Sequence, residues 1–336
     1  MIIPVKTRNG QYNIYLDRGA IHRAGELLDL ERRVLVVTDD GVPSQYAEAV
    51  AAKAKEAYIK TIEQGEKSKC MRVFEEILSC LVENGFTRTD CVVAVGGGVV
   101  GDMSGFAAAC YMRGIDFYNI PTTVLSQVDS SIGGKTAIDF KQYKNIVGAF
   151  WPPKAVIIDP DTLSTLPSRQ ISNGLAESVK MALTSDAELF EKLEGEDIYS
   201  NIDHIIYRSL LIKKAVVEED ETEKGLRKIL NFGHTIAHAI ESEKAMEDYY
   251  HGECVAVGML PMCSPEVRAR LEAVLRKLNL PTDVPCDVDV ICEAVRHDKK
   301  AAGSNITLIY VNEVGKFEMR TCSIDEYTRE IKEKLK

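Results

Sequence analysis

The sequence has little of what marks membrane, secreted or nucleic-acid-binding proteins. No apolar run reaches the roughly 20 residues that span a bilayer, and residues 1–6 lack the basic and apolar regions of a signal peptide. We therefore expect a cytoplasmic protein with no membrane partner. The formal net charge of −10 argues against nucleic acid as a partner, because phosphate backbones are bound mainly by clustered Lys and Arg.

Signs of a disulfide framework or a Cys-based zinc site are also absent. The 9 cysteines are scattered and never spaced Cys-x-x-Cys, so we expect reduced, mostly buried thiols. The sequence has no internal repeat or low-complexity tract. What is present is a globular composition over 336 residues, which is long for one core and predicts two domains.

Hydrophobic patterning changes near residue 160. Before it, short β-rich runs alternate with helical segments, which predicts a Rossmann-like parallel-sheet α/β domain over residues 1–160. The strands are expected at 12–16, 33–38, 58–62, 91–95, 117–120 and 155–158, and the helices at 43–56, 70–83 and 102–111. Residues 161–336 should form a mainly α-helical domain, with helices at 167–183, 198–217, 225–242, 251–260 and 265–278 and one hairpin at 306–320 turned at 312–315.

A glycine-rich loop follows the strand expected at 91–95. Gly96, Gly98 and Gly101 satisfy G-x-G-x-x-G between a strand and a helix, a pattern that binds the pyrophosphate of a dinucleotide. The alternative is a glycine turn needed only for close packing. The acid that would bond the ribose could be Asp116, about 20 residues on, or Asp39. We favour Asp39, because ligands lie at the carboxyl ends of parallel strands.

Lys135 follows two glycines and precedes a threonine. The first glycine of a P-loop would fall at Asp129, so an NTPase is excluded. With Lys144 and Asn145 close behind, the stretch suits an anionic ligand, and an ordinary solvent loop is an equal alternative.

The segment 225–242 carries polar groups on an otherwise apolar helical pattern. At about 100° per residue, four polar residues share an arc of roughly 60°: Arg227, Asn231, His234 and His238. This pattern favours a buried helix that lines a wet cavity over a surface helix, whose polar face is usually built from Lys and Glu.

Spacing alone pairs His234 with His238 as metal ligands, one helical turn apart as in H-E-x-x-H proteases, although Thr235 stands in place of the glutamate. A catalytic zinc takes three protein ligands. His251 is a third candidate, and Glu177, which shares a helix face with Lys180, could supply a carboxylate. For a lone Glu or His, a solvated helix residue remains the alternative.

Taken together, these motifs resemble the 3-dehydroquinate synthase family over nearly the whole chain. The matching blocks are GGGVVGD at 96–102, YMRG at 111–114, PTT at 121–123, VDSSIGGKT at 128–136, KN at 144–145, GLAE at 174–177, NFGHT at 231–235 and HGE at 251–253. The resemblance implies a Rossmann-like domain and a helical domain, with NAD and zinc, or cobalt, meeting in a cleft between them.

The resemblance also assigns residues. It makes Glu177, His234 and His251 the metal ligands and turns His238 towards the substrate phosphate. NAD would be held by Asp39, Glu66, Lys69, Gly98, Val99, Val100, Gly101, Asp102, Thr122, Thr123, Lys135, Lys144, Thr162, Leu163, Ser164 and Thr165. Substrate would be bound by Asp129, Lys135, Asn145, Lys180, Lys213, Arg227, Asn231 and His238, with Lys299 or Lys300. Arg113 would reach the phosphate in the partner subunit's site, which implies a homodimer.

The reaction so implied belongs to the shikimate pathway of aromatic amino acid biosynthesis. It converts 3-deoxy-D-arabino-heptulosonate 7-phosphate, a small sugar phosphate, into 3-dehydroquinate and phosphate by transient oxidation with NAD, β-elimination, reduction, ring opening and intramolecular aldol closure. The alternatives are a related sugar phosphate cyclase, a glycerol-dehydrogenase-like oxidoreductase with net NADH release, and a non-catalytic NAD-binding protein with a structural zinc.

Two features depart from the family pattern. Ala237 stands where the family commonly has Gly, and we expect its methyl group to shift helix packing slightly. The segment after Met259 is shorter than usual in the family, and we expect this to alter the packing of the helical domain.

Overall fold

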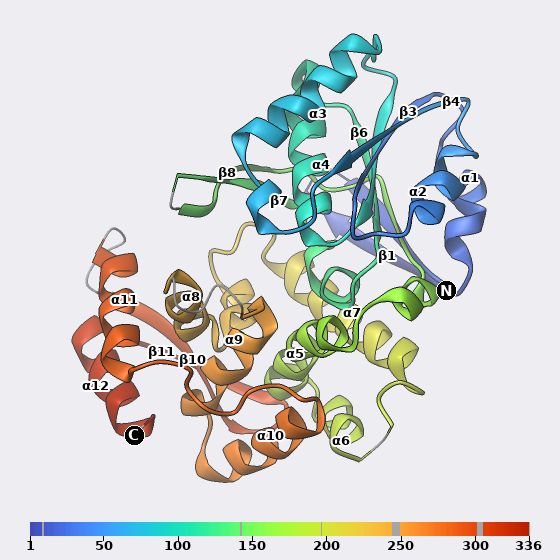
Figure 1. Ribbon diagram of the computed structural model, residues 1–336. Helices are drawn as coiled ribbons and strands as arrows, with labels where there is room; N and C mark the ends of the chain where they lie inside the picture. Colours follow the sequence, from blue (N-terminus) through green and yellow to red (C-terminus); the bar gives the residue numbers. More distant parts are fainter. Residues whose placement is uncertain (9, 142, 196, 244–248, 301–304, 336) are drawn as a thin grey trace. The chain divides into compact units, whose positions relative to one another are not determined.

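The computed structural model describes residues 1–8, 10–141, 143–195, 197–243, 249–300 and 305–335, with 297–300 described by their backbone alone. The chain divides into two compact units, Met1–Pro167 and Ser168–Lys336 (Figure 1). The turn that follows residue 160 belongs to the first unit, because Thr162 Oγ1 accepts a hydrogen bond from Gln127 Nε2. The division therefore lies slightly later in the chain than the pattern change at residue 160.

The first unit is built on a seven-stranded sheet in the order β1-β2-β9-β6-β5-β3-β4. All neighbouring strands run parallel except β1, which is antiparallel to β2. The strands are β1 (Ile2–Thr7), β2 (Gly10–Leu16), β3 (Arg33–Asp39), β4 (Glu56–Ile62), β5 (Cys91–Gly96), β6 (Asp116–Pro121) and β9 (Ala155–Ile158). The expected parallel sheet is therefore confirmed.

Side chains that alternate along β5 fill two separate cores, one on each face of the sheet. Cys91, Val93 and Val95 belong to the core under η1 (Ala20–Arg23), α1 (Ala24–Leu27) and α2 (Ser44–Ala51). Val92 and Ala94 belong to the core under α3 (Met71–Glu83) and α4 (Gly98–Cys110). A strand covered on both faces has to be apolar throughout, which is why β5 lacks an alternating polar pattern.

Some local predictions in this unit are wrong. The patterns miss β1 and the antiparallel hairpin of β7 (Lys135–Phe140) and β8 (Tyr143–Phe150), so Lys135 opens a strand instead of standing in a loop. The helix expected at 43–56 ends at Ala51, because β4 already begins at Glu56. The helix expected from residue 102 begins at Gly98, so the glycine loop includes its first turn.

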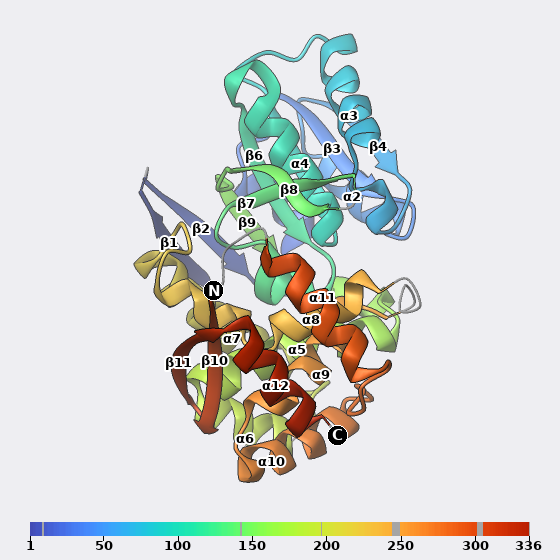
Figure 2. The same ribbon diagram turned by 90° about the vertical axis from the view of Figure 1, so that its left-hand side faces the viewer.

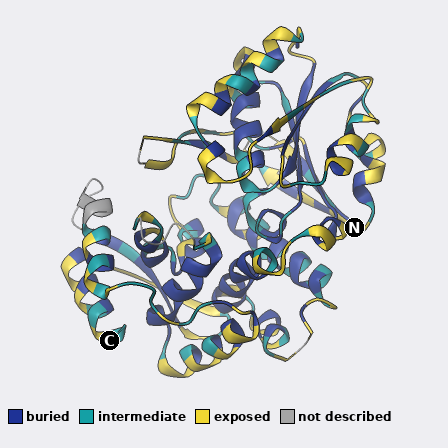
Figure 3. Cartoon of the chain, viewed as in Figure 1, coloured by how far each residue is buried: buried dark blue, intermediate teal, exposed yellow. Residues whose placement is uncertain are grey.

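The second unit is mainly helical, as expected. Its helices are α5 (Ser168–Ser185), α6 (Ala187–Gly195), α7 (Ile202–Glu219), α8 (His234–Ser242), α9 (His251–Met259), α10 (Pro265–Lys277), α11 (Val288–Lys300) and α12 (Ile324–Lys334). The hairpin of β10 (Asn305–Glu313) and β11 (Lys316–Ser323) packs against α12 (Figure 2). Helix α5 is central: every residue from Ser172 to Thr184 is buried, against α6, α7 and α9 (Figure 3).

The single helix expected at 225–242 is wrong. A short 3-10 helix, η6 (Leu226–Asn231), is followed by a break, and α8 begins only at His234. Gly233 makes the break with φ 79, and a Cβ there would lie 2.9 Å from the backbone nitrogen of Met259. The polar residues therefore share no continuous stripe.

The shortened segment after Met259 closes in one 3-10 turn, η8 (Leu260–Met262). Ser264 then caps α10 by accepting a hydrogen bond from the backbone nitrogen of Val267, and α10 packs against α6 and β10. In the described part of the chain, no helix has both the length and the apolar character needed to cross a membrane.

Candidate active site

Asp39 and the glycine loop, both expected to bind the nucleotide, lie at the carboxyl ends of the neighbouring strands β3 and β5. The chain runs outward from β3 to β4 and then places β5 on the other side of β3, so the strand order reverses between β3 and β5. Ligands of open α/β sheets bind at such a reversal. Asp39 ends β3, and the glycine loop starts where β5 ends at Gly96.

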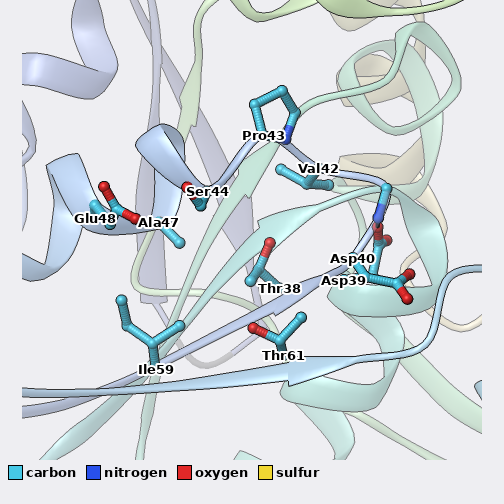
Figure 4. A pocket seen from close by; sticks show the side chains of 11 residues that line it. Thr38, Asp39, Asp40, Val42, Pro43, Ser44, Ala47, Glu48, Ile59 and Thr61 are labelled. Carbon is cyan, nitrogen blue, oxygen red and sulfur yellow. Dashed lines mark hydrogen bonds between the residues drawn. The ribbon is translucent and has the colours of Figure 1, made fainter.

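A hollow of about 480 Å³ opens at the carboxyl ends of β3 and β4, with α2 on its other side (Figure 4). Thr38 and Asp39 line it and are both buried. The hydroxyl of Thr38 has no hydrogen-bond partner among the described residues. Burial raises the pKa of the Asp39 carboxyl, while hydrogen bonds from the backbone of Gly41 and Val42 oppose the rise. The hollow therefore offers an unused hydroxyl and a carboxylate to a polar ligand.

Asp116, the other candidate for the ribose, lies at the amino ends of the strands, away from Asp39. It begins β6, and its carboxylate accepts a hydrogen bond from Arg32 Nη1 at 2.8 Å. Of the two acids, only Asp39 stands where the strands end.

Packing requires a glycine at position 96 and leaves little room for a side chain at positions 98 and 101. A Cβ on Gly96 would lie 2.7 Å from the Val100 side chain, and one on Gly101 would lie 3.1 Å from the Asn119 amide. A Cβ on Gly98 would lie 3.3 Å from Ser130 Oγ. Packing does not exclude the functional interpretation, because the first turn of α4 leaves backbone N–H groups available to an anion.

Lys69, Asp102 and Glu66, which the resemblance assigns to NAD binding, lie close together beside α4. Lys69 Nζ lies 2.6 Å from Asp102 Oδ2 and 3.9 Å from Glu66 Oε1. Burial lowers the pKa of the Lys69 ammonium, but the charges of Asp102 and Glu66 outweigh it and raise the pKa above its usual value. Lys69 is therefore a fixed positive charge beside α4.

Other residues assigned to NAD follow the carboxyl ends of β6 and β9. The backbone nitrogen of Thr122 donates to the Gly96 carbonyl at 2.9 Å. After β9, the short helix η5 (Pro160–Thr165) contains Thr162, Leu163, Ser164 and Thr165. Thr162 and Leu163 are buried, which anchors the turn in the core of the unit. The turn follows the carboxyl end of β9, just as Asp39 stands at the carboxyl end of β3.

The hairpin β7–β8 carries the polar residues expected after position 129. Lys135 opens β7, and Lys144 and Asn145 are exposed on β8. Asn145 has φ 54, and its backbone nitrogen donates to Asp139 Oδ1 at 2.7 Å. Asp129 lies in the π-helical turn η4 (Ser126–Ser130), a form that is frequent at functional sites.

In the second unit, Glu177 on α5, His234 on α8 and His251 on α9 form a group that could hold a metal ion. One ligand atom from each lies within 4.8 Å of the others. Glu177 Oε1 lies 3.7 Å from His234 Nε2 and 3.6 Å from His251 Nε2. Oε1 is buried and has no hydrogen-bond partner among the described residues. These separations are close to the roughly 3.3–3.5 Å between tetrahedral ligands with bonds of about 2.0–2.2 Å.

The surroundings shift two of the three residues, Glu177 and His234, toward the protonation states that bind metals. Burial raises the pKa of Glu177, but the Lys180 ammonium and the two histidines outweigh it and hold the pKa well below its usual value. Burial, followed by the charge of Lys180, holds the pKa of His234 well below its usual value. A carboxylate and a neutral imidazole are the protonation states that bind metals, and Glu177 and His234 have them. Burial lowers the pKa of His251, but its contacts with Glu177 and Glu241 outweigh it and raise the pKa to about 10, so His251 has to release a proton when a metal binds.

The buried cations of the second unit favour an anionic ligand. Lys180, Lys213 and Arg227 are 2%, 5% and 2% exposed. Arg227 donates from Nη1 to the Glu221 carbonyl, and Lys180 pairs with Glu177. Burying a cation is costly unless charges or hydrogen bonds compensate it, so three buried cations in one unit are candidates for binding an anionic ligand.

The outcome for the remaining expected residues is mixed. His238 is exposed on α8, and its ring centroid lies 5.6 Å from that of His234. It is not part of the metal-binding group found among the described residues, which favours the separate roles implied by the resemblance over the pairing suggested by spacing alone.

Asn231 Nδ2 donates to Glu223 Oε1 at 2.7 Å. Lys299 and Lys300 lie on α11, and their side chains are outside the described part of the structure.

Sequence reasoning missed Glu241, which lies 2.7 Å from His251 Nδ1. Its spacing of seven residues after His234 puts it two turns along the same face of α8. That spacing was the available signal.

The fold is that of the sugar phosphate cyclases. 2-Deoxy-scyllo-inosose synthase, solved with carbaglucose-6-phosphate, NAD+ and Co2+, superposes with a TM-score of 0.89 at 26% identity, covering 100% of both chains. 2-epi-5-epi-Valiolone synthase from Streptomyces hygroscopicus subsp. jinggangensis, solved with NAD+ and Zn2+, superposes with a TM-score of 0.88 at 28% identity, covering 98% of this chain and 97% of that one.

Within this class, the sequence identifies the family. Residues 59–173 match the 3-dehydroquinate synthase N-terminal family, and residues 174–301 match the 3-dehydroquinate synthase C-terminal family. The chain is 40% identical to a 3-dehydroquinate synthase of Streptococcus suis over 97% of its own length and 98% of that protein's length. It therefore belongs to the 3-dehydroquinate synthase family.

Proposed function

We propose that this protein converts 3-deoxy-D-arabino-heptulosonate 7-phosphate into 3-dehydroquinate and phosphate, a lyase reaction of the shikimate pathway, with NAD and Zn2+ or Co2+ as cofactors. The observation that carries this proposal is the group of Glu177, His234 and His251 beside buried Lys180, in a chain of this family. Three N and O ligands leave a fourth position for a substrate oxygen, whereas structural zinc is normally closed by four Cys or His ligands.

NAD binds at the carboxyl edge of the sheet in this proposal. Asp39 and the hollow beside it take the adenosine end, and the first turn of α4, from Gly98 to Asp102, takes the pyrophosphate. Lys69 contributes a positive charge held by Asp102. Glu66, Thr122, Thr123, Lys144 and the turn 162–165 complete the set of residues.

The substrate carries a carboxylate and a phosphate, and the chain supplies cations and amides for both. Arg227 and Lys213 bind the carboxylate, while Asn231 and His238 bind the phosphate, with support from Asp129, Lys135, Asn145, Lys180 and Lys299. When bound, NAD supplies reversible hydride acceptance and the metal lowers the pKa of a substrate alcohol. The protein's own contribution is to position the substrate and to balance its charge.

The active form in this proposal is a homodimer in the cytoplasm, in which Arg113 reaches the phosphate of the partner's site. Arg113 is exposed and has φ 71, beside Met112 with φ 50. Left-handed backbone at a non-glycine residue costs about 1–3 kcal/mol, persists only where the surrounding structure holds it, and is often found at functional sites. The expected cleft shared by NAD and metal stays a prediction.

The test supplies the heptulosonate phosphate with NAD and Zn2+ and follows inorganic phosphate before and after a chelator. We expect release that stops on chelation and resumes when Zn2+ is restored. Phosphate release that is absent, or that continues in the presence of the chelator, contradicts the proposal.

The absorbance of NADH, recorded in the same experiment, separates the proposal from the alternatives. A synthase regenerates NAD in every turnover, so no NADH accumulates, whereas a glycerol-dehydrogenase-like enzyme accumulates NADH. A related cyclase that prefers another sugar phosphate would turn over that substrate faster than the heptulosonate.

A further inference from the structure

The backbone at His251 is fixed from two directions. Asn173 Oδ1 on α5 accepts a hydrogen bond from the Gly252 backbone nitrogen at 2.6 Å. Glu253 accepts from the Tyr250 backbone nitrogen at 2.9 Å and pairs with Arg169 at 2.7 Å. The first turn of α9 is therefore held in place, but these contacts leave the His251 ring free to rotate about its side-chain bonds.

The Glu241 carboxylate removes that freedom. Its Oε1 lies 2.7 Å from His251 Nδ1, while His251 Nε2 faces Glu177 Oε1 at 3.6 Å. A hydrogen bond from Nδ1 to a carboxylate keeps the proton on Nδ1 and leaves the lone pair of Nε2 for a metal.

The other histidine of the group is held by a different acceptor. His234 Nδ1 lies 3.2 Å from the Phe232 carbonyl, so its partner is a backbone atom two residues away. The Glu241 side chain is only 10% exposed, and acids are rarely so well covered unless they are paired. Helix α8 thus carries His234 of the metal-binding group and, seven residues later, the carboxylate that contacts His251.

We propose that Glu241 is a positioning residue that orients His251 for metal binding through its hydrogen bond to Nδ1. This inference rests on the proposed metal site. Glu241 touches neither substrate nor metal in this role. Its removal should therefore act first on metal affinity, and on turnover only as far as metal is lost.

The experiment measures the Zn2+ dissociation constant of the metal-free protein by competition with a metal-binding dye. Glu241→Ala should weaken binding by about 10–100-fold, the usual effect of losing such a partner. Glu241→Gln keeps an oxygen acceptor and should stay within about threefold of the unaltered protein if orientation is the main role. Glu243→Gln, two residues further along the chain, is the matched control and should have no effect.

If Glu241→Ala does not fold, Glu241→Leu and the absorption spectrum of bound Co2+ still test the proposal. Glu241→Leu fills the same space without an acceptor and should show the same weakening if Glu241→Ala does not fold. With Co2+ bound, the visible absorption bands should change in Glu241→Leu and not in Glu243→Gln, because they report ligand geometry.

Zn2+ affinity of Glu241→Ala and Glu241→Leu within about twofold of the unaltered protein, while His251→Ala loses the metal, would overturn the role of Glu241 and leave the metal site intact. Unchanged affinity in His251→Ala would instead overturn the metal site itself.

Discussion

At the residue scale, His234 and His238 lie one turn apart on α8 but have different surroundings. His234 is largely buried, 3.7 Å from Glu177, whereas His238 is exposed. Two histidines on one helix face can thus have different roles. The metal content of a variant of each histidine distinguishes these roles.

We predict that His234→Ala is purified without metal, whereas His238→Ala retains about one metal ion per chain. The reason is that only His234 offers a nitrogen to the group with Glu177 and His251. Metal content is measured by atomic emission after dialysis. Equal loss of metal in both variants would restore the pairing of His234 with His238.

Arg227 is 2% exposed, and its guanidinium donates from Nη1 to the Glu221 carbonyl. Its backbone nitrogen also donates to Asp220 Oδ2 at 3.1 Å, so one contact of this turn does not depend on the side chain. We predict that Arg227→Ala lowers kcat/KM by about 100-fold, or roughly 2.7 kcal/mol, because a charge-assisted contact to a substrate carboxylate is lost.

The control for this prediction is Lys224→Ala, an exposed cation in the same turn, which should leave kcat/KM unchanged. Urea unfolding of both variants checks the fold. Turnover of Arg227→Ala within about twofold, roughly 0.4 kcal/mol, would sink the assignment.

At the element scale, the metal-binding group depends on how closely α9 approaches α5. A Cβ on Gly252 would lie 1.9 Å from the backbone oxygen of Asn173. Backbone cannot yield as the end of a side chain can, so any side chain at position 252 must push α9 away from α5.

We predict that Gly252→Ala costs about 1–3 kcal/mol of unfolding free energy and weakens Zn2+ binding, because His251 moves with α9. Gly195→Ala, where a Cβ meets nothing within 4 Å, is the matched control and should be neutral or slightly stabilising. Denaturant unfolding and metal titration are the measurements. A Gly252→Ala protein as stable as Gly195→Ala would contradict the close contact.

The break at Gly233 separates η6 from α8. Its left-handed backbone ends η6 and lets α8 begin in a new direction, while Ala237 lies fully buried within an unbroken α8. The alanine that departs from the family pattern is therefore compatible with a continuous helix.

At the scale of the whole molecule, the proposed dimer makes Arg113 a residue of the partner's site. Mixing two inactive variants tests this. In a heterodimer of Arg113→Ala and His234→Ala, one site would combine an intact Arg113 from one subunit with an intact His234 from the other.

We predict that unfolding and refolding an equimolar mixture restores about a quarter of the unaltered activity, because half of the dimers are mixed and each has one complete site. Phosphate release measures the recovery. Each variant refolded alone is the control. No recovery in a mixture shown to contain heterodimers would place Arg113 in its own subunit's site or outside any site.

The sequence by itself determined the parallel sheet, the helical second half and the glycine loop. These follow from periodicity and from short-range rules of strand and helix formation, which act over a few neighbouring residues. Family motifs added the grouping of Glu177, His234 and His251, which the structure brings together and which spacing along the chain did not predict.

Only the tertiary structure decided three other features. It broke the segment 225–242 at Gly233, brought Lys69 to Asp102 and set Glu241 against His251. Each of these depends on a close approach between parts of the chain that no local pattern records, since packing distances of a few ångströms are decided by how whole elements fit together.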